Sequence, residues 1–185
     1  FVYNIVQLLR EAPDAPAFEV VRNDCLEFSR LEEFGGIILS PGPGIPEEAG
    51  DLQALIDRCR ESHPMFGVCL GHQAIACSFG ASLHRLEQPL HGHPTLLQHI
   101  VASDPLLAGL PERVTVGRYH SWVVEAATLP PSLAVTSVDK EGYIMSFRHR
   151  SLPLHGVQFH PESCISNCGR KIMENWLDIC RQAFR

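Results

Sequence analysis

The first 80 residues alternate short apolar runs with stretches in which apolar residues recur every three or four positions. The apolar runs are typical of buried β-strands, and they cover residues 18–22, 36–40 and 65–68. The periodic stretches predict helices over residues 2–10, 51–61 and 71–79. This alternation favours βαβ units, in which helices cover a sheet of parallel strands.

The pattern changes after residue 81 to closely spaced apolar runs, which are typical of antiparallel strands. These runs cover residues 95–101, 113–117, 133–139, 144–149 and 154–159. A last helix is predicted over residues 166–184, with Ile172, Trp176 and Ile179 on one side. We therefore expect one domain over residues 1–185, with a three-layer α/β fold. Its mostly parallel sheet is flanked by helices and carries a small antiparallel extension. Because the chain starts in a predicted helix, we also expect a first β-strand ahead of Phe1.

The composition argues against a nucleic-acid-binding protein, a membrane-spanning protein and a disulfide-stabilised domain. The chain has 185 residues, of which 45% are hydrophobic and 19% charged, and its net charge is -6 with only 15 Lys and Arg. Scattered basic residues do not form the stripe that nucleic-acid binding needs, and no apolar run reaches the roughly 20 residues of a membrane span. The seven cysteines are odd in number and include no C-x-x-C pair, so we expect no disulfide framework, no metal site and a cytoplasmic location.

The strongest chemical signal is the G-x-C-x-G sequence of residues 67–71, between a predicted strand and a predicted helix. Such glycines permit the sharp strand-to-helix turn that presents a nucleophile at a helix N-terminus. There we expect a lowered pKa for the Cys69 thiol, and an oxyanion contact from the backbone N–H of Leu70. The alternative is that Cys69 is a buried structural cysteine.

A thiol nucleophile needs a base, and the base needs an orienting group. His160 and Glu162 stand two residues apart at the end of a predicted strand, separated by Pro161. This spacing lets the carboxylate reach the imidazole, as a Cys-His-Glu triad requires. The alternative for His160 alone is a buried core histidine.

A third segment, Ser-Pro-Gly-Pro-Gly-Ile-Pro at residues 40–46, follows another predicted strand. Alternating Pro and Gly make a rigid loop with exposed backbone N–H groups, which suits an oxyanion hole. No Gly-Lys-Ser/Thr follows, so it is not a phosphate loop. The alternative is an ordinary turn.

Taken together, SPGPG, GVCLGHQ and GVQFHPES resemble the class I, triad-type glutamine amidotransferases over essentially the whole chain. The shorter matches YNIV, VRND, LHG and GRYHS resemble the amidotransferase subunits of anthranilate synthase and aminodeoxychorismate synthase. The resemblance implies a flavodoxin-like sheet, hydrolysis of L-glutamine to glutamate and ammonia, and no cofactor. It also implies a partner that receives the ammonia, namely a chorismate-binding synthase subunit.

The resemblance also implies a role for each matching residue. Cys69 is then the nucleophile, His160 the base and Glu162 the orienting carboxylate. Gly44 and Leu70 supply oxyanion N–H groups. The remaining implied contacts to glutamine come from the loop residues Gly42 and Pro43, from Gln73, and from the backbone of Ser121 and Trp122.

Two positions depart from the family pattern: His93 stands where lysine is usual, and Trp122 stands where leucine is usual. Two other functions stay open. One is a free-standing Cys-His hydrolase of the same fold acting on γ-glutamyl compounds, and the other is a silent module that only docks on a synthase.

Overall fold

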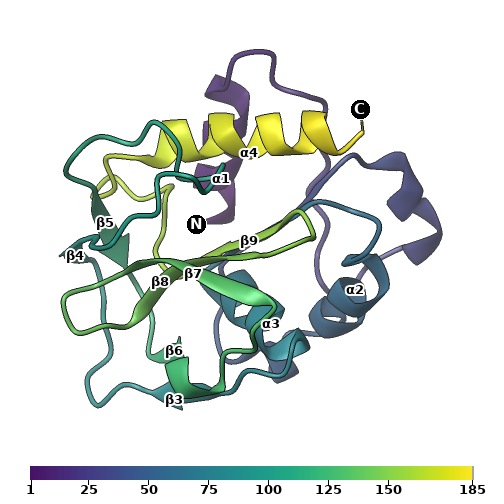
Figure 1. The fold of residues 1–185 in the computed structure, drawn as a ribbon. Coiled ribbons are helices and arrows are strands. Elements are labelled where there is room, and N and C mark those ends of the chain that lie inside the picture. Colours follow the sequence, from purple (N-terminus) through teal and green to yellow (C-terminus); the bar gives the residue numbers. More distant parts are fainter. Residues whose placement is uncertain (185) are drawn as a thin grey trace.

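The computed structural model describes residues 1–184, and its centre is a five-stranded sheet in the order β1-β2-β9-β8-β7 (Figure 1). The strands are β1 (Ile37–Leu39), β2 (Met65–Val68), β9 (Leu154–Val157), β8 (Ile144–His149) and β7 (Leu133–Val138). The first three run parallel, and β8 and β7 continue the sheet in antiparallel pairing. Because β2 and β9 are parallel neighbours, their carboxyl ends lie at the same edge of the sheet.

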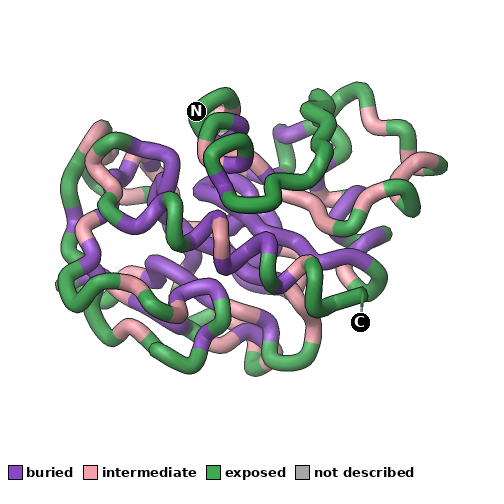
Figure 2. The backbone as a smooth tube through the Cα atoms, turned by 90° about the horizontal axis from the view of Figure 1, so that it is seen from above, coloured by how far each residue is buried: buried purple, intermediate pink, exposed green. Residues whose placement is uncertain are grey.

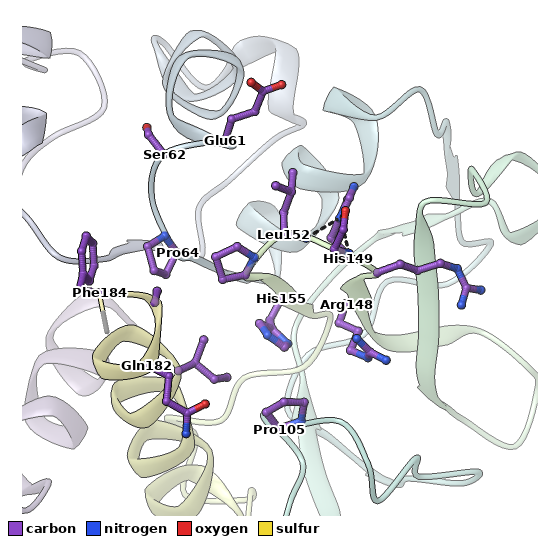
Figure 3. Close-up of a pocket in the computed structure, with 15 residues that line it drawn as sticks. Glu61, Ser62, Pro64, Pro105, Arg148, His149, Leu152, His155, Gln182 and Phe184 are labelled. Carbon is purple, nitrogen blue, oxygen red and sulfur yellow. Dashed lines mark hydrogen bonds between the residues drawn. The ribbon is translucent and has the colours of Figure 1, made fainter.

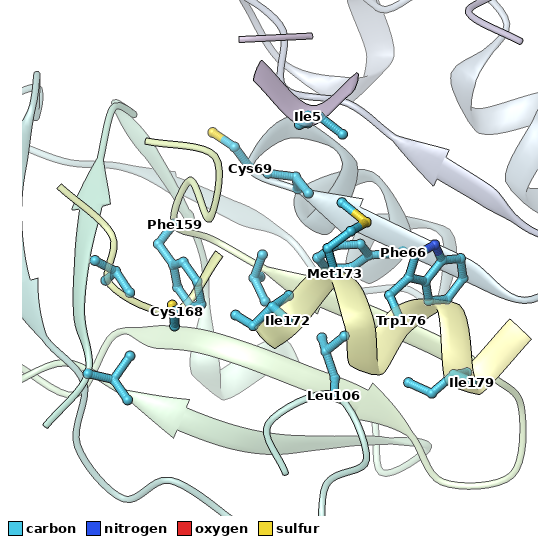
Figure 4. Packing of buried hydrophobic residues seen from close by; sticks show 14 of the residues in the cluster. Ile5, Phe66, Cys69, Leu106, Phe159, Cys168, Ile172, Met173, Trp176 and Ile179 are labelled. Carbon is cyan, nitrogen blue, oxygen red and sulfur yellow. The ribbon is translucent and has the colours of Figure 1, made fainter. Parts of the chain in front are cut away.

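Helices cover both faces of this sheet, which confirms the predicted three-layer α/β fold (Figure 1). Helices α1 (Val2–Glu11) and α4 (Gly169–Ala183) lie on one face, and α2 (Leu52–Cys59) and α3 (Leu70–Ser78) lie on the other. Successive residues of a strand point to opposite faces. Phe66 accordingly packs on Trp176 of α4, with ring centroids 5.6 Å apart (Figure 4). Met65 instead joins the cluster under α2 and α3.

The predicted antiparallel extension is present as two small sheets. One pairs β3 (Leu83–Arg85) with β6 (Trp122–Val124), and the other pairs β4 (His93–Leu96) with β5 (Thr115–Arg118). An isolated bridge between Gly117 and His160 ties the second sheet to the chain just beyond β9. Three short 3₁₀ helices complete the elements: η1 (Phe28–Glu33), η2 (Pro46–Glu48) and η3 (Ala126–Thr128).

One predicted strand is wrong. Residues 18–22 form no strand and are exposed throughout, as Figure 2 shows for the segment that follows α1. An apolar run becomes a strand only when its backbone groups find a ladder partner, and among the described residues this segment has none. The strand expected ahead of Phe1 stays a prediction.

The other predicted elements are confirmed, with ends that move by a few residues. The run at 95–101 moves most, since β4 begins at His93 and ends at Leu96. None of the helices in residues 1–184 is long and apolar enough to cross a membrane.

Candidate active site

Cys69 lies at the sharp turn between β2 and α3 that the sequence predicts. Its backbone has φ 52° and ψ -100°, a left-handed φ that L-residues rarely adopt. A Cβ on Gly67 would clash with the backbone of Gly71, and a Cβ on Gly71 would clash with the carbonyl of Leu39. The two glycines are therefore what allow the strand, the turn and the helix to pack so closely.

His160 and Glu162 come together just beyond β9. The imidazole Nδ1 and the carboxylate Oε1 are 2.7 Å apart, and the two side chains are 2% and 0% exposed. Because a carboxylate accepts hydrogen bonds, Nδ1 carries the proton and Nε2 keeps its lone pair. Nε2 is buried and has no hydrogen-bond partner among the described residues. His160 thus presents a free basic nitrogen, as a general base requires.

The backbone of His160 is held on both sides. Its N–H donates to the carbonyl of Gly117 at 2.9 Å, and its carbonyl accepts from Ser166 Oγ at 2.5 Å. Two aromatic rings also pack on the imidazole, with centroid distances of 4.4 Å to Phe1 and 5.0 Å to Tyr119. Cys69 is only 5% exposed and His160 only 1%, so both side chains are buried in this structure.

The expected lowering of the Cys69 pKa is wrong. Burial raises the pKa of the thiol to about 12, and the nearby charge of Glu162 raises it further, against smaller effects of the Leu70 N–H and the Gln158 amide. Desolvation of a thiolate here outweighs the stabilisation that the helix N-terminus gives. Burial therefore favours the neutral thiol of Cys69 over its thiolate in this structure.

His72 is the other histidine close to Cys69 in sequence. Its side chain is fully buried on the opposite face of the sheet, where its ring lies 4.5 Å from that of Phe147. Burial lowers the pKa of His72 to about 3. Such a weakly basic imidazole is a poor substitute for His160.

The Pro-Gly loop follows β1 and lies against the elbow. A Cβ on Gly42 would come within 2.8 Å of the Leu70 side chain, so the loop and the start of α3 are in close contact. Gly44 has φ +75°, and a Cβ there would lie 2.9 Å from Glu48 Oε2. Of the three loop residues, Gly42 is the one whose contact with the elbow is seen. The roles of Gly42, Pro43 and Gly44 towards substrate stay predictions.

Gln73 and Trp122 are also brought together. Gln73 Nε2 donates to the Trp122 carbonyl at 2.8 Å and to Gln158 Oε1 at 3.1 Å, which uses both of its hydrogens. Only Oε1 of Gln73 is left to accept from a substrate ammonium group. The carbonyl of Ser121 accepts from the N–H of Leu86 at 2.8 Å. The predicted roles of Gln73, Ser121 and Trp122 towards glutamine are not tested by these contacts.

The family model described as "Glutamine amidotransferase class-I" matches residues 1–180. The chain belongs to this family. It is 43% identical over 185 residues to anthranilate synthase component 2 of Mycobacterium tuberculosis (strain ATCC 25618 / H37Rv), covering 97% of this chain and 78% of that protein. It is 39% identical over 184 residues to aminodeoxychorismate/anthranilate synthase component 2 of Bacillus subtilis (strain 168), covering 98% and 93%.

Among solved structures, this amidotransferase chain resembles a putative GMP synthase protein of Thermoplasma acidophilum. The TM-score is 0.85 at 27% identity, over 98% of this chain and 89% of that one. A glutamine amidotransferase of Thermotoga maritima is more distant, with a TM-score of 0.59 at 21% identity over 82% and 64% of the two chains. That second likeness shows the fold alone.

Two cavities of this amidotransferase lie away from Cys69 and His160. One, of about 470 Å³, is lined by Pro64, His149, His155 and Phe184 among others, where β2 and β9 begin (Figure 3). The other, of about 850 Å³, has Arg118, Asp139 and residues of β3 and β4 in its wall. Within residues 1–184, no three His, Cys, Asp or Glu side chains are grouped so that they could hold a metal ion.

Sequence reasoning missed Gln158 as a residue of the site. It is fully buried, and its Nε2 donates to Cys69 Sγ at 3.7 Å. The only signal was its place two residues before His160, which puts its side chain on the same side of the extended chain.

Proposed function

We propose that this chain hydrolyses L-glutamine to glutamate and ammonia, and that it delivers the ammonia to a chorismate-using synthase subunit. The observation that carries the proposal is the joint placement of Cys69 and His160. Cys69 stands on a strained elbow after β2, and the buried His160–Glu162 pair stands just beyond the parallel neighbour β9.

The first half of the reaction forms a thioester. Nε2 of His160 takes the Cys69 proton as the sulfur attacks the carboxamide carbon, and the C–N bond then breaks as the same proton passes to the leaving nitrogen. Ammonia departs and a γ-glutamyl thioester remains. Glu162 keeps the required tautomer of His160 and stabilises the imidazolium that forms between the two steps.

The second half hydrolyses the thioester. His160 takes a proton from water, the hydroxyl oxygen bonds to the acyl carbon, and the sulfur leaves and regains a proton from His160. In both halves a negative charge develops on the former carboxamide oxygen. The backbone N–H groups of Gly44 and Leu70 are the proposed donors to it.

The proposed glutamine site lies between the Pro-Gly loop and α3. Gly42 and Pro43 form the loop side, and Gln73 Oε1 accepts from the α-ammonium group. The backbone of Ser121 and Trp122 lies on the opposite side. The hydrogen bond from Gln73 to the Trp122 carbonyl fixes these two parts relative to each other.

The proposed partner is the subunit that binds chorismate. The relatives named as component 2 of anthranilate or aminodeoxychorismate synthase are matched over 78% and 93% of their lengths. Free ammonia is protonated near neutral pH and then loses its nucleophilicity, so we expect a docked acceptor. The proposed contact surface consists of the Pro-Gly loop, residues 91–92 and residues 119–121.

All seven cysteines are free among the described residues, which fits the proposed cytoplasmic location.

Glutamate release by the chain alone, and with each of the two kinds of chorismate-using subunit, tests this function. We expect slow hydrolysis alone and faster hydrolysis with chorismate and a matching subunit, together with an aminated product. Equal hydrolysis with and without any subunit would favour a free-standing hydrolase of γ-glutamyl compounds. Binding without hydrolysis would favour a silent docking module.

A further inference from the structure

A line of buried hydrogen bonds ends on the sulfur of Cys69. Gln158 Nε2 donates to Cys69 Sγ at 3.7 Å, and Gln158 Oε1 accepts from Gln73 Nε2 at 3.1 Å. The backbone of Gln158 is fixed as well, since its N–H donates to the Met145 carbonyl at 2.9 Å. Because Gln73 offers a donor, it selects the orientation in which the Gln158 carbonyl faces Gln73 and the amide N–H faces the sulfur.

Gln73 is itself held by hydrogen bonds whose donors and acceptors can be assigned. The Trp122 carbonyl accepts from Gln73 Nε2 at 2.8 Å and lies 2.9 Å from His120 Nδ1. Arg118 Nε donates to His120 Nε2 at 3.0 Å, and an arginine has only donors. Nε2 of His120 is therefore the acceptor, and Nδ1 carries the proton that goes to the Trp122 carbonyl.

The far end of the line is an ion pair. Arg118 Nη1 lies 2.6 Å from Asp139 Oδ2, and both side chains are almost fully buried. Arg118 donates to both Asp139 and His120, and the Trp122 carbonyl accepts from both His120 and Gln73. Each donor and each acceptor is thereby assigned, and the line ends with the Gln158 N–H aimed at the sulfur.

We propose that Gln158 is a catalytic residue whose amide N–H stabilises the Cys69 thiolate, and that Gln73 is a positioning residue that keeps this N–H aimed at the sulfur. The proposal rests on the proposed function for its role in turnover. The sulfur carries negative charge when His160 takes its proton, and again when it leaves the thioester. A neutral amide donor helps at both moments and, unlike a cation, does not repel the imidazolium that His160 becomes when it takes the proton.

Alkylation of Cys69 by iodoacetamide, followed peptide by peptide in the isolated chain, tests the thiolate contact without any glutamine. At a fixed pH near 9, below the thiol pKa, the rate depends on the thiolate fraction and on access of the reagent to the sulfur, and the buried Cys59 and Cys168 report any change in access. Removing a hydrogen bond to a charged group raises the pKa by about one to two units, so Gln158→Met should slow alkylation of Cys69 by roughly tenfold or more. Gln182→Met, on the exposed end of α4, is the matched control and should leave the rate unchanged.

Gln73→Met tests the positioning step without adding a charge near Cys69. A methionine cannot donate to Gln158, so the Gln158 amide loses the partner that orients it and alkylation of Cys69 should slow as well. Loosened packing would act in the opposite direction, because it would speed alkylation of Cys69 and of the buried Cys59 and Cys168. Exposed Cys25 is the internal reference for reagent and pH.

Slowed Cys69 alkylation in both variants, with Cys25 unchanged, supports the proposal. A rate within about twofold of the unaltered chain in Gln158→Met overturns it, and so does faster alkylation. If Gln158→Met does not fold, the Gln73→Met rate decides alone by the same criterion. Failure of the proposed function is a separate result, because it would appear as no glutamine hydrolysis in the unaltered complex while the alkylation rates still differ.

Discussion

Replacing Glu162 by glutamine removes one charge from a buried pair and changes almost no volume. In the unaltered chain, the Glu162 carboxylate accepts the Nδ1 proton of His160 over 2.7 Å, with both side chains nearly unexposed. A glutamine can instead donate to Nδ1, which moves the imidazole proton to Nε2. That nitrogen then has no lone pair with which to take the Cys69 proton.

The size of the effect follows from the lost charged hydrogen bond. A hydrogen bond to a charged group contributes about 1.5–3 kcal/mol, and 1.36 kcal/mol corresponds to a tenfold change in rate. Loss of the stabilisation that Glu162 gives to the His160 imidazolium therefore slows turnover by about 10- to 150-fold. The unfavourable tautomer slows it further. We still expect a higher residual rate than in His160→Ala, which lacks the base itself.

Glutamate release by the complex with chorismate and a synthase subunit is the assay for Glu162→Gln. The matched control is Glu125→Gln, which alters an exposed pair in which His84 Nδ1 and Glu125 Oε2 lie 3.1 Å apart. An exposed pair contributes little, so the control should stay within about twofold of the unaltered chain. Unaltered turnover in Glu162→Gln, or a loss as complete as in His160→Ala, would refute the assigned role of Glu162.

Three further predictions concern the nucleophile, the loop and stability. A glutamine-like diazoketone should label Cys69 and spare exposed Cys25, and label found on Cys25 by peptide mass would contradict the role of Cys69 as nucleophile. Cys69→Ser should abolish glutamine hydrolysis without unfolding the chain. Gly44→Ala should slow glutamine hydrolysis by about 10²-fold or more. Gly80 is also at positive φ but has open space around it, so the control Gly80→Ala should lower stability alone. Equal turnover in the two variants would mean that the Pro-Gly loop has no part in catalysis. The pKa values of His72 and His120 are lowered from 6.5 to about 3 by burial, helped at His120 by Arg118, so only the unfolded chain takes up these protons as the pH falls below 6.5. Urea unfolding should therefore show a stability loss of about 2 kcal/mol per histidine from pH 7 to pH 5, and His120→Gln should remove about half of it; an unchanged slope would contradict the assignment.

Much of the fold follows from local patterns in the chain. The parallel strands β1 and β2 and the helices after them coincide with apolar runs and with residues that recur at helical spacing. The run at 18–22 has the same composition as these strands, yet it forms none, because pairing depends on a neighbour that local sequence does not reveal. The three-residue strands β3 and β6 are too short to show any alternation.

The candidate site also combines features that local sequence predicts with features that depend on the whole fold. The turn at Cys69 and the His160–Glu162 contact depend on nearby residues, and both are where the sequence predicts them. The pKa of Cys69 depends on how deeply the packed domain buries it, which the motif does not state. The link from Gln73 to Gln158 joins residues 85 positions apart, so only the fold could reveal it.

Transfer of amide nitrogen from glutamine to the aminated product is the direct test of whether Cys69 supplies the ammonia. The complex of this chain with a chorismate-using subunit is given L-glutamine labelled with ¹⁵N in the side-chain amide, and the aminated product is analysed by mass spectrometry. We expect labelled product from the unaltered complex and none from Cys69→Ser, which should still form product from added ammonium because the thioester step is then bypassed. Labelled product from the Cys69→Ser complex would contradict the account.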